Sequence, residues 1–108
     1  MKVKDIAALI EGVAPREFQE SYDNAGLAVG SPTMEVTGVV VCLDVSEQVV
    51  EEAISLGANM VVSHHPVIFS GLKTITGKNA VERIVLKAIQ NNIALYAAHT
   101  NLDSVWGG

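Results

Sequence analysis

The stretch Met60-Val61-Val62-Ser63-His64-His65-Pro66 joins a short apolar run to a pair of adjacent histidines. A second stretch repeats this arrangement, because the apolar run Ile93 to Ala97 is followed closely by His99-Thr100-Asn101-Leu102-Asp103. Each apolar run predicts a buried strand, and the three histidines of the chain all lie at these two strand ends. If the strands are parallel neighbours, both polar clusters emerge at the carboxyl edge of one sheet, where open α/β sheets bind their ligands.

The segments between and before these stretches predict alternating strands and helices. Residues Val36 to Leu43 form a near-continuous apolar run, which predicts a strand buried on both faces of a parallel sheet. Ser46 and Gly57 are typical capping residues, and they enclose an amphipathic helical pattern. Asn79 is expected to cap a further helix that extends to residue 90. Helical connections of this length join parallel strands by right-handed crossovers.

The N-terminal part adds a helix and a short strand. Apolar residues recur at helical spacing from Ile6 to Val13, which predicts an amphipathic helix. The segment from Leu27 to Val29 is short enough to be an edge strand, and residues 66–78 form a long loop of a kind that is often functional. We therefore expect a single α/β domain over residues 1–108, with a mostly parallel sheet and flanking helices. The abrupt end after the second polar cluster suggests a fragment of a longer protein.

The composition argues against several classes of protein. The chain has 108 residues, of which 49% are apolar, and this allows one domain with a modest core. Its net charge is −5 and its basic residues are scattered, which argues against nucleic-acid binding as the main role. Cys42, the lone cysteine, is expected to be a buried core thiol in a reducing compartment. With no signal peptide and no apolar stretch of about 20 residues, we expect a cytoplasmic protein without membrane contact.

The two polar clusters supply the candidate metal ligands, which are His64, His65 and Asp103. Imidazole and carboxylate groups together suit first-row divalent metals, and these ligands accept Zn, Mn, Fe, Co or Ni. Adjacent side chains on an extended segment point to opposite faces, so the two histidines would not easily bind one ion. Two ions could be bound, one by each ring, if the segment turns at Pro66. The alternative is a hydrogen-bonded pair of histidines without metal.

Three further side chains have more than one interpretation. Asp103 could cap a following helix as well as bind metal. His99 could bind metal, act as an acid or base near neutral pH, or orient a metal ligand by a hydrogen bond without binding the metal itself. Asp44 follows the apolar run of residues 36–43. Its position at a strand end would allow it to hydrogen-bond to a metal ligand without binding the metal. Because the three candidate ligands cannot saturate two ions, other ligands would have to come from further sequence, another chain or water.

Three motifs occur in order along the chain. They are Asp23-Asn24-Ala25-Gly26-Leu27 with Val29-Gly30, Ser63-His64-His65-Pro66 with Phe69, and His99-Thr100-Asn101-Leu102-Asp103 with Gly107-Gly108. In these motifs the chain resembles the Nif-three-like family, also known as GTP cyclohydrolase I type-two homologues.

The resemblance implies an α/β fold with a dinuclear metal centre. It places the ligands on His64, His65 and Asp103, and it places His99 beside the metals. Family members also have a C-terminal His-x-x-x-Glu pair, and full-length relatives resemble ring-shaped homohexamers built from dimers. This chain lacks that pair, so it resembles the amino-terminal part of a family member.

Two classes of function are compatible with these residues. The first is a metal-dependent hydrolase that opens a purine-nucleotide ring or cleaves a phosphoester in a small-molecule substrate. Lys73, Lys78 and Arg83 are the nearby basic residues for a phosphate group. The second is a non-catalytic metal-binding or regulatory module that acts through protein contacts. A plain structural domain is a third interpretation, and it would contain no metal.

Overall fold

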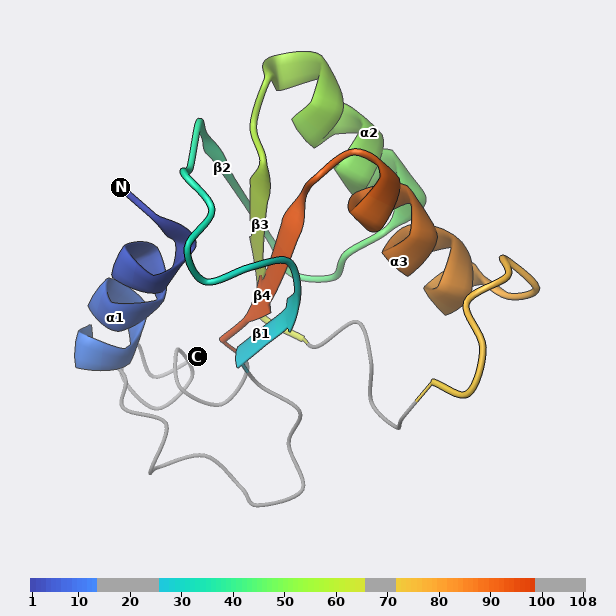
Figure 1. The fold of residues 1–108 in the computed structure, drawn as a ribbon, viewed down its shortest axis with the longest axis horizontal. Coiled ribbons are helices and arrows are strands. Elements are labelled where there is room, and N and C mark those ends of the chain that lie inside the picture. The colour runs from blue at the N-terminus through green and yellow to red at the C-terminus, as the bar shows by residue number, and fades with distance from the viewer. Residues whose placement is uncertain (14–25, 66–71, 99–108) are drawn as a thin grey trace.

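Strand β3 (Met60–Ser63) is an inner strand of the sheet with a parallel neighbour on each side. It pairs in parallel with β2 (Val39–Cys42) on one side and with β4 (Ala94–Ala97) on the other. These contacts come from a computed structural model, which describes residues 1–13, 26–65 and 72–98 (Figure 1). The predicted neighbourhood of the two histidine-bearing strands is therefore confirmed for the strands themselves.

The direction of the first strand, β1 (Gly26–Val29), corrects the expected sheet. The strand order is β1-β4-β3-β2, and β1 pairs with β4 in the antiparallel sense. The sheet is therefore mixed, whereas the sequence predicted a mostly parallel one. The reason is that no helical crossover connects β1 to a neighbouring strand, so its direction is not fixed by the rule that governs β2, β3 and β4. Its position at an edge agrees with the prediction for residues 27–29.

Helices cover both faces of this sheet (Figure 1). Helices α2 (Glu47–Leu56) and α3 (Ala80–Gln90) lie on one face, where Val50, Val85 and Leu95 belong to one buried cluster. Helix α1 (Val3–Val13) lies on the other face, where Val3 and Met60 belong to a second cluster. No helix in the described segments is long and apolar enough to cross a membrane.

The prediction that residues 36–43 form a strand buried on both faces is wrong. Strand β2 is shorter than this run, and its residues alternate between exposed and half-buried. The exposed side chains are Val39, Val41 and Leu43. The reason is that β2 is the terminal strand of the sheet, and the α1 cluster includes β3 and β4 side chains but none from β2. Only one face of β2, with Val40 and Cys42, packs against the core.

The predicted helix caps are confirmed. The Ser46 hydroxyl accepts a hydrogen bond from the Val49 backbone N–H at 3.1 Å, and the Asn79 side chain accepts one from Glu82 N–H at 2.9 Å. Gly57 ends α2 in the left-handed conformation with φ 73°. Each cap satisfies backbone groups that a helix end would otherwise leave unpaired. Local side-chain chemistry therefore sets where the two crossover helices begin and where α2 ends.

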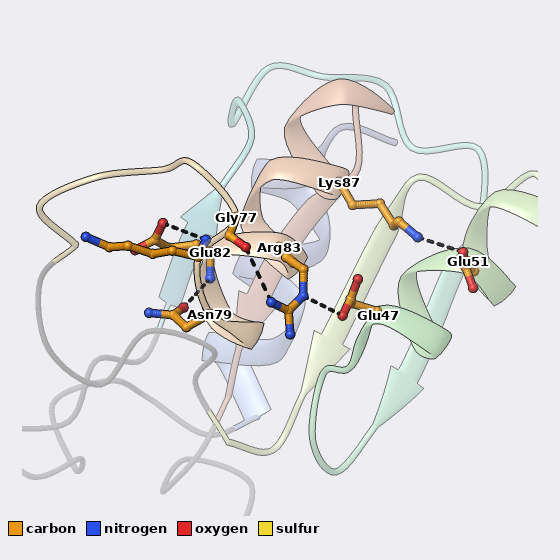
Figure 2. Close-up of polar contacts among 8 residues, drawn as sticks. Glu47, Glu51, Gly77, Asn79, Glu82, Arg83 and Lys87 are labelled. Atoms are coloured by element: carbon orange, nitrogen blue, oxygen red, sulfur yellow. Dashed lines mark hydrogen bonds and ion pairs between the residues drawn. The ribbon is translucent and has the colours of Figure 1, made fainter.

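Two ion pairs connect the crossover helices α2 and α3 (Figure 2). Arg83 Nε lies 3.1 Å from a Glu47 carboxylate oxygen, and Lys87 Nζ lies 2.7 Å from Glu51 Oε1. The Arg83 guanidinium also donates to the Gly77 carbonyl at 3.3 Å. These pairs are at least partly exposed, so each adds little stability. Glu47 and Glu51 lie one turn apart on α2, as Arg83 and Lys87 do on α3, so successive turns of the two helices are paired.

Glu82 ties the loop before α3 to the first turn of that helix. The residue is 3% exposed, and its carboxylate accepts hydrogen bonds from Thr76 N–H at 3.0 Å and Lys78 N–H at 3.4 Å. The hydroxyls of Thr74 and Thr76 also donate to it, each at 3.2 Å. The backbone hydrogen bond from Thr76 is the main cause that lowers the pKa of Glu82. A buried carboxylate is tolerated here because donors surround it.

We predict that Glu82→Gln lowers the melting temperature at neutral pH. We also expect the melting temperature of this variant to fall less steeply as the pH is lowered. A lowered pKa in the folded state means that the carboxylate stabilises the fold above its unfolded pKa, and that this stabilisation is lost as the pH falls through the folded pKa. Thermal unfolding measured from neutral to acidic pH tests this. The exposed Glu52→Gln is the matched control and should reproduce the unaltered profile. An unchanged acid limb in Glu82→Gln would contradict the assignment.

A pair of leucine substitutions tests the assignment of core and surface. Leu95 is 2% exposed and Leu43 is 69% exposed. We expect Leu95→Ala to lower the free energy of unfolding by about 2–5 kcal/mol, because it leaves a cavity in the core. Leu43→Ala should change it by no more than about 0.5 kcal/mol, as exposed positions usually do. Denaturant unfolding gives both values, and similar losses would refute the exposed position of Leu43 directly after β2.

Candidate functional site

His64 and His65 lie directly beyond β3, where the backbone pairing with the β2 segment continues past the strand ends. His64 N–H donates to the Cys42 carbonyl and His65 N–H donates to the Leu43 carbonyl, each at 3.0 Å. The chain bends at these two residues. The Ser63 hydroxyl donates to the His65 carbonyl at 2.7 Å and so closes the bend. Backbone and side-chain hydrogen bonds together fix the histidine pair at the carboxyl edge.

The two imidazole rings lie side by side. Their centroids are 4.7 Å apart and the ring planes meet at 74°, so one ring presents its edge to the other. The expectation that His64 and His65 point to opposite faces is therefore wrong. That expectation assumed an extended segment up to Pro66, but the chain already bends at the histidines, which removes the strand alternation. The two rings therefore lie on the same side of the chain, in edge-to-face contact.

His65 also contacts the segment that follows β2. Its Nδ1 atom lies 2.8 Å from an oxygen of the Asp44 carboxylate. A carboxylate oxygen can only accept, so Nδ1 carries the proton in this hydrogen bond. The two side chains are 40% and 73% exposed, respectively. Asp44 thus contacts a candidate ligand, and its role as a support for that ligand stays a prediction.

The second polar cluster follows β4, and the structure describes the chain up to its start. Ala97 is the register partner of Ser63, and Ala98 N–H donates to the Ser63 carbonyl at 2.8 Å. The carboxyl ends of β3 and β4 therefore meet beside the histidine pair. His99 and Asp103 lie outside the described residues, so their convergence with His64 and His65 stays a prediction.

The described donors fit one side of a metal site. Two neighbouring imidazoles suit borderline divalent metals, and a carboxylate behind one of them is the usual support for a metal-binding histidine. Within residues 1–13, 26–65 and 72–98, no group of three or more histidine, cysteine, aspartate or glutamate side chains could hold an ion by itself. A complete site would need a further ligand, and Asp103 is the candidate from the sequence.

Cys42 lies near this edge and is only partly exposed. Its side chain packs against the α2 and α3 core and is half-buried, so the expected core thiol is only partly shielded. Burial raises the pKa of the Cys42 thiol, and the negative charge of Asp44 raises it further.

Sequence reasoning missed the part that Ser63 plays in this arrangement. It is buried, and its hydroxyl caps the bend that brings the two rings together. A small hydroxyl residue between an apolar run and the histidines was the available signal, because serine side chains often bond to nearby backbone in turns. Asn79, Glu82 and the α2–α3 ion pairs make the helix cap and the helix contacts described above.

Comparison with known proteins gives a family match over the whole chain. A family model described as Duf34/NIF3 (NGG1p interacting factor 3) matches residues 1–108. A Clostridium perfringens relative named GTP cyclohydrolase 1 type 2 homolog is 43% identical over 108 residues, which are 100% of this chain and 41% of the relative. A Lactococcus lactis relative of the same name is also 43% identical, and the chain covers 42% of it. The chain therefore spans less than half the length of these relatives.

Solved structures give the same result. The Staphylococcus aureus protein SA1388 matches 95% of this chain and 29% of its own, with a TM-score of 0.91 and 45% identity. A Bacillus cereus protein related to NIF3 matches 95% of this chain and 28% of its own, with a TM-score of 0.89 and 44% identity. The mixed α/β fold described above agrees with both.

We predict that Ser63→Ala destabilises the fold and disturbs the histidine pair. Loss of a buried side-chain hydrogen bond costs about 0.5–1.5 kcal/mol of unfolding free energy, and without it the bend at His65 is less constrained. Ser55→Ala is the matched control, because the Ser55 hydroxyl also donates to a carbonyl but on an exposed helix turn. Denaturant unfolding and the NMR shifts of the imidazole rings measure the two effects. Equal behaviour of the two variants would argue against this role.

Proposed function

The chain belongs to the Duf34/NIF3 family, and on this premise we propose that it contributes to a divalent-metal site of a metal-dependent hydrolase. The observation that carries the proposal is the pair of imidazole rings, 4.7 Å apart, at the carboxyl edge of the sheet. The hydrogen bond from Ala98 to Ser63 supports it, because the segment with the remaining candidate ligand begins beside the pair.

The proposed ligands are His64, His65 and Asp103, and two ions per complete site are proposed. Imidazole and carboxylate donors leave Zn, Mn, Fe, Co and Ni as candidates. When bound, such ions supply a water of lowered pKa, and hence hydroxide near neutral pH. His99 is proposed as the acid or base that exchanges a proton with the reacting group, because an imidazole titrates in the right range for that role.

The proposed substrate is a small molecule with an electrophilic carbon or phosphorus, and a nucleotide is one example. The name GTP cyclohydrolase 1 type 2 homolog, which the relatives carry, supports this class. Arg83 is a poor candidate for binding a phosphate, because Glu47 and the Gly77 carbonyl already occupy its guanidinium. A cytoplasmic location and assembly into a homo-oligomer belong to the same proposal.

A non-catalytic metal-binding or regulatory module is the second candidate function. It needs the proposed metal ligands but not the proton transfer assigned to His99. Such a module would bind metal and a protein partner without turnover. Dependence of turnover on both metal and His99 separates the two functions, since only the hydrolase requires them together.

We predict that the purified protein binds Zn²⁺, Mn²⁺ or Fe²⁺ and that the candidate ligands control the amount bound. His64→Ala, His65→Ala and Asp103→Ala should each lose most of the metal, because each removes a direct donor. His99→Ala should keep its metal and lose turnover of nucleotide or phosphoester substrates. Elemental analysis after gel filtration measures the metal-to-protein ratio.

The control is Glu52→Ala, which removes an exposed carboxylate from α2 and should leave the metal content unchanged. A ratio of zero in the unaltered protein after incubation with each metal would end the metal proposal. If the unaltered protein binds metal but turns over none of the substrates tested, the result would favour the regulatory module over the hydrolase.

A further inference from the structure

We propose that Asp44 is a positioning residue, which holds the His65 ring with its proton on Nδ1 so that Nε2 is the metal-binding nitrogen. This inference rests on the proposed metal site and assigns a role to a residue outside the ligand set. The observation behind it is the 2.8 Å contact between His65 Nδ1 and Asp44 Oδ1.

Two backbone hydrogen bonds align the segments that carry Asp44 and His65. Leu43, directly before Asp44, accepts a hydrogen bond from His65 N–H at 3.0 Å. Its neighbour Cys42 accepts one from His64 in the same way. The two segments are thus in register when the side chains meet, and the carboxylate and the ring are joined by one side-chain and one backbone link. This double attachment limits rotation of the ring about its side-chain bonds.

The exposure of Asp44 and His65 argues against fold stability as the main role of their contact. Asp44 is 73% exposed and His65 is 40% exposed. Exposed ion pairs contribute little to the free energy of folding, so stabilising the fold is a weak explanation for this one. Orientation of the ring needs no burial. A carboxylate behind a histidine fixes the tautomer and increases the basicity of the opposite nitrogen, which is how metal sites support their histidines.

The groups around the contact are consistent with this role. The His64 ring lies on one side of His65, at 4.7 Å between centroids. The half-buried Cys42 thiol lies two residues before Asp44, and the Asp44 charge contributes to its raised pKa. The hydrogen bond between Nδ1 and the Asp44 carboxylate favours the tautomer of His65 that carries its proton on Nδ1.

The first test is the tautomer of His65 in the metal-free chain. Two-bond ¹H–¹⁵N NMR of the imidazole nitrogens, in mildly alkaline buffer, distinguishes a proton on Nδ1 from one on Nε2. We expect the Nδ1–H form in the unaltered protein and in Asp44→Asn, whose side-chain oxygen can still accept. Asp44→Ala should shift His65 toward the Nε2–H form that free imidazole side chains prefer. Glu52→Ala, with the same loss of charge at an exposed site, should show no shift.

The second test is the affinity for Zn²⁺, measured by competition with a chromophoric chelator. Asp44→Ala should weaken binding by about 10–100-fold, the usual effect of removing a group that supports a ligand. Asp44→Asn should recover part of this loss, and Glu52→Ala should bind as the unaltered chain does. Because Asp44 is exposed, the variants are expected to fold, and circular dichroism checks this.

The outcomes separate this inference from the proposed function. An unchanged His65 tautomer in Asp44→Ala overturns the positioning role, whatever the metal affinity. A shifted tautomer with unchanged Zn²⁺ affinity shows that the contact does not serve metal binding, and it also overturns the inference. If the unaltered chain binds no Zn²⁺, the metal site itself fails, while the tautomer measurement still decides whether Asp44 orients His65.

Discussion

The register of β3 between its two parallel neighbours is the constraint on which the rest of the structure depends. Ser63 is the register partner of both Cys42 and Ala97, so the three strands end in one row. The hydrogen bonds beyond that row, from His64 to Cys42 and from Ala98 to Ser63, continue the same alignment. A shift of one residue in either pairing would turn alternate side chains to the wrong face and separate the polar groups at the edge.

The parts of the fold that follow from local chemistry could be predicted from the sequence. Ser46, Gly57 and Asn79 cap or end helices in the structure as their chemistry predicts. The two crossover helices then force β2, β3 and β4 into parallel pairs. The direction of β1 and the exposure of β2 could not be predicted in this way, because an apolar run does not reveal which of its faces another element will cover. The exposure of β2 depends on where α1 packs, and no helical crossover fixes the direction of β1.

Parts of the candidate site could be predicted from the sequence, and other parts depend on tertiary packing. That His64 and His65 stand at a strand end was predictable, because the apolar run before them is a strong signal. Their side-by-side arrangement was not, since it depends on the bend closed by Ser63. The contact between Asp44 and His65 joins residues 21 positions apart, and only the register of β2 on β3 brings them together. His99 and Asp103 lie outside the described residues, so their placement at the site remains a prediction.

The terminal position of β2 has a consequence for solubility. Two apolar side chains of this strand, Val39 and Val41, are exposed at the border of the sheet, and the exposed Leu43 follows directly. Such a border is a template for edge-to-edge pairing between molecules, which leads to aggregation when it is long and flat. Two features reduce that hazard: the strand has four residues, and the charged Asp44 lies just beyond its end. A charge introduced at the exposed Val41 would oppose edge-to-edge pairing through β2 still further.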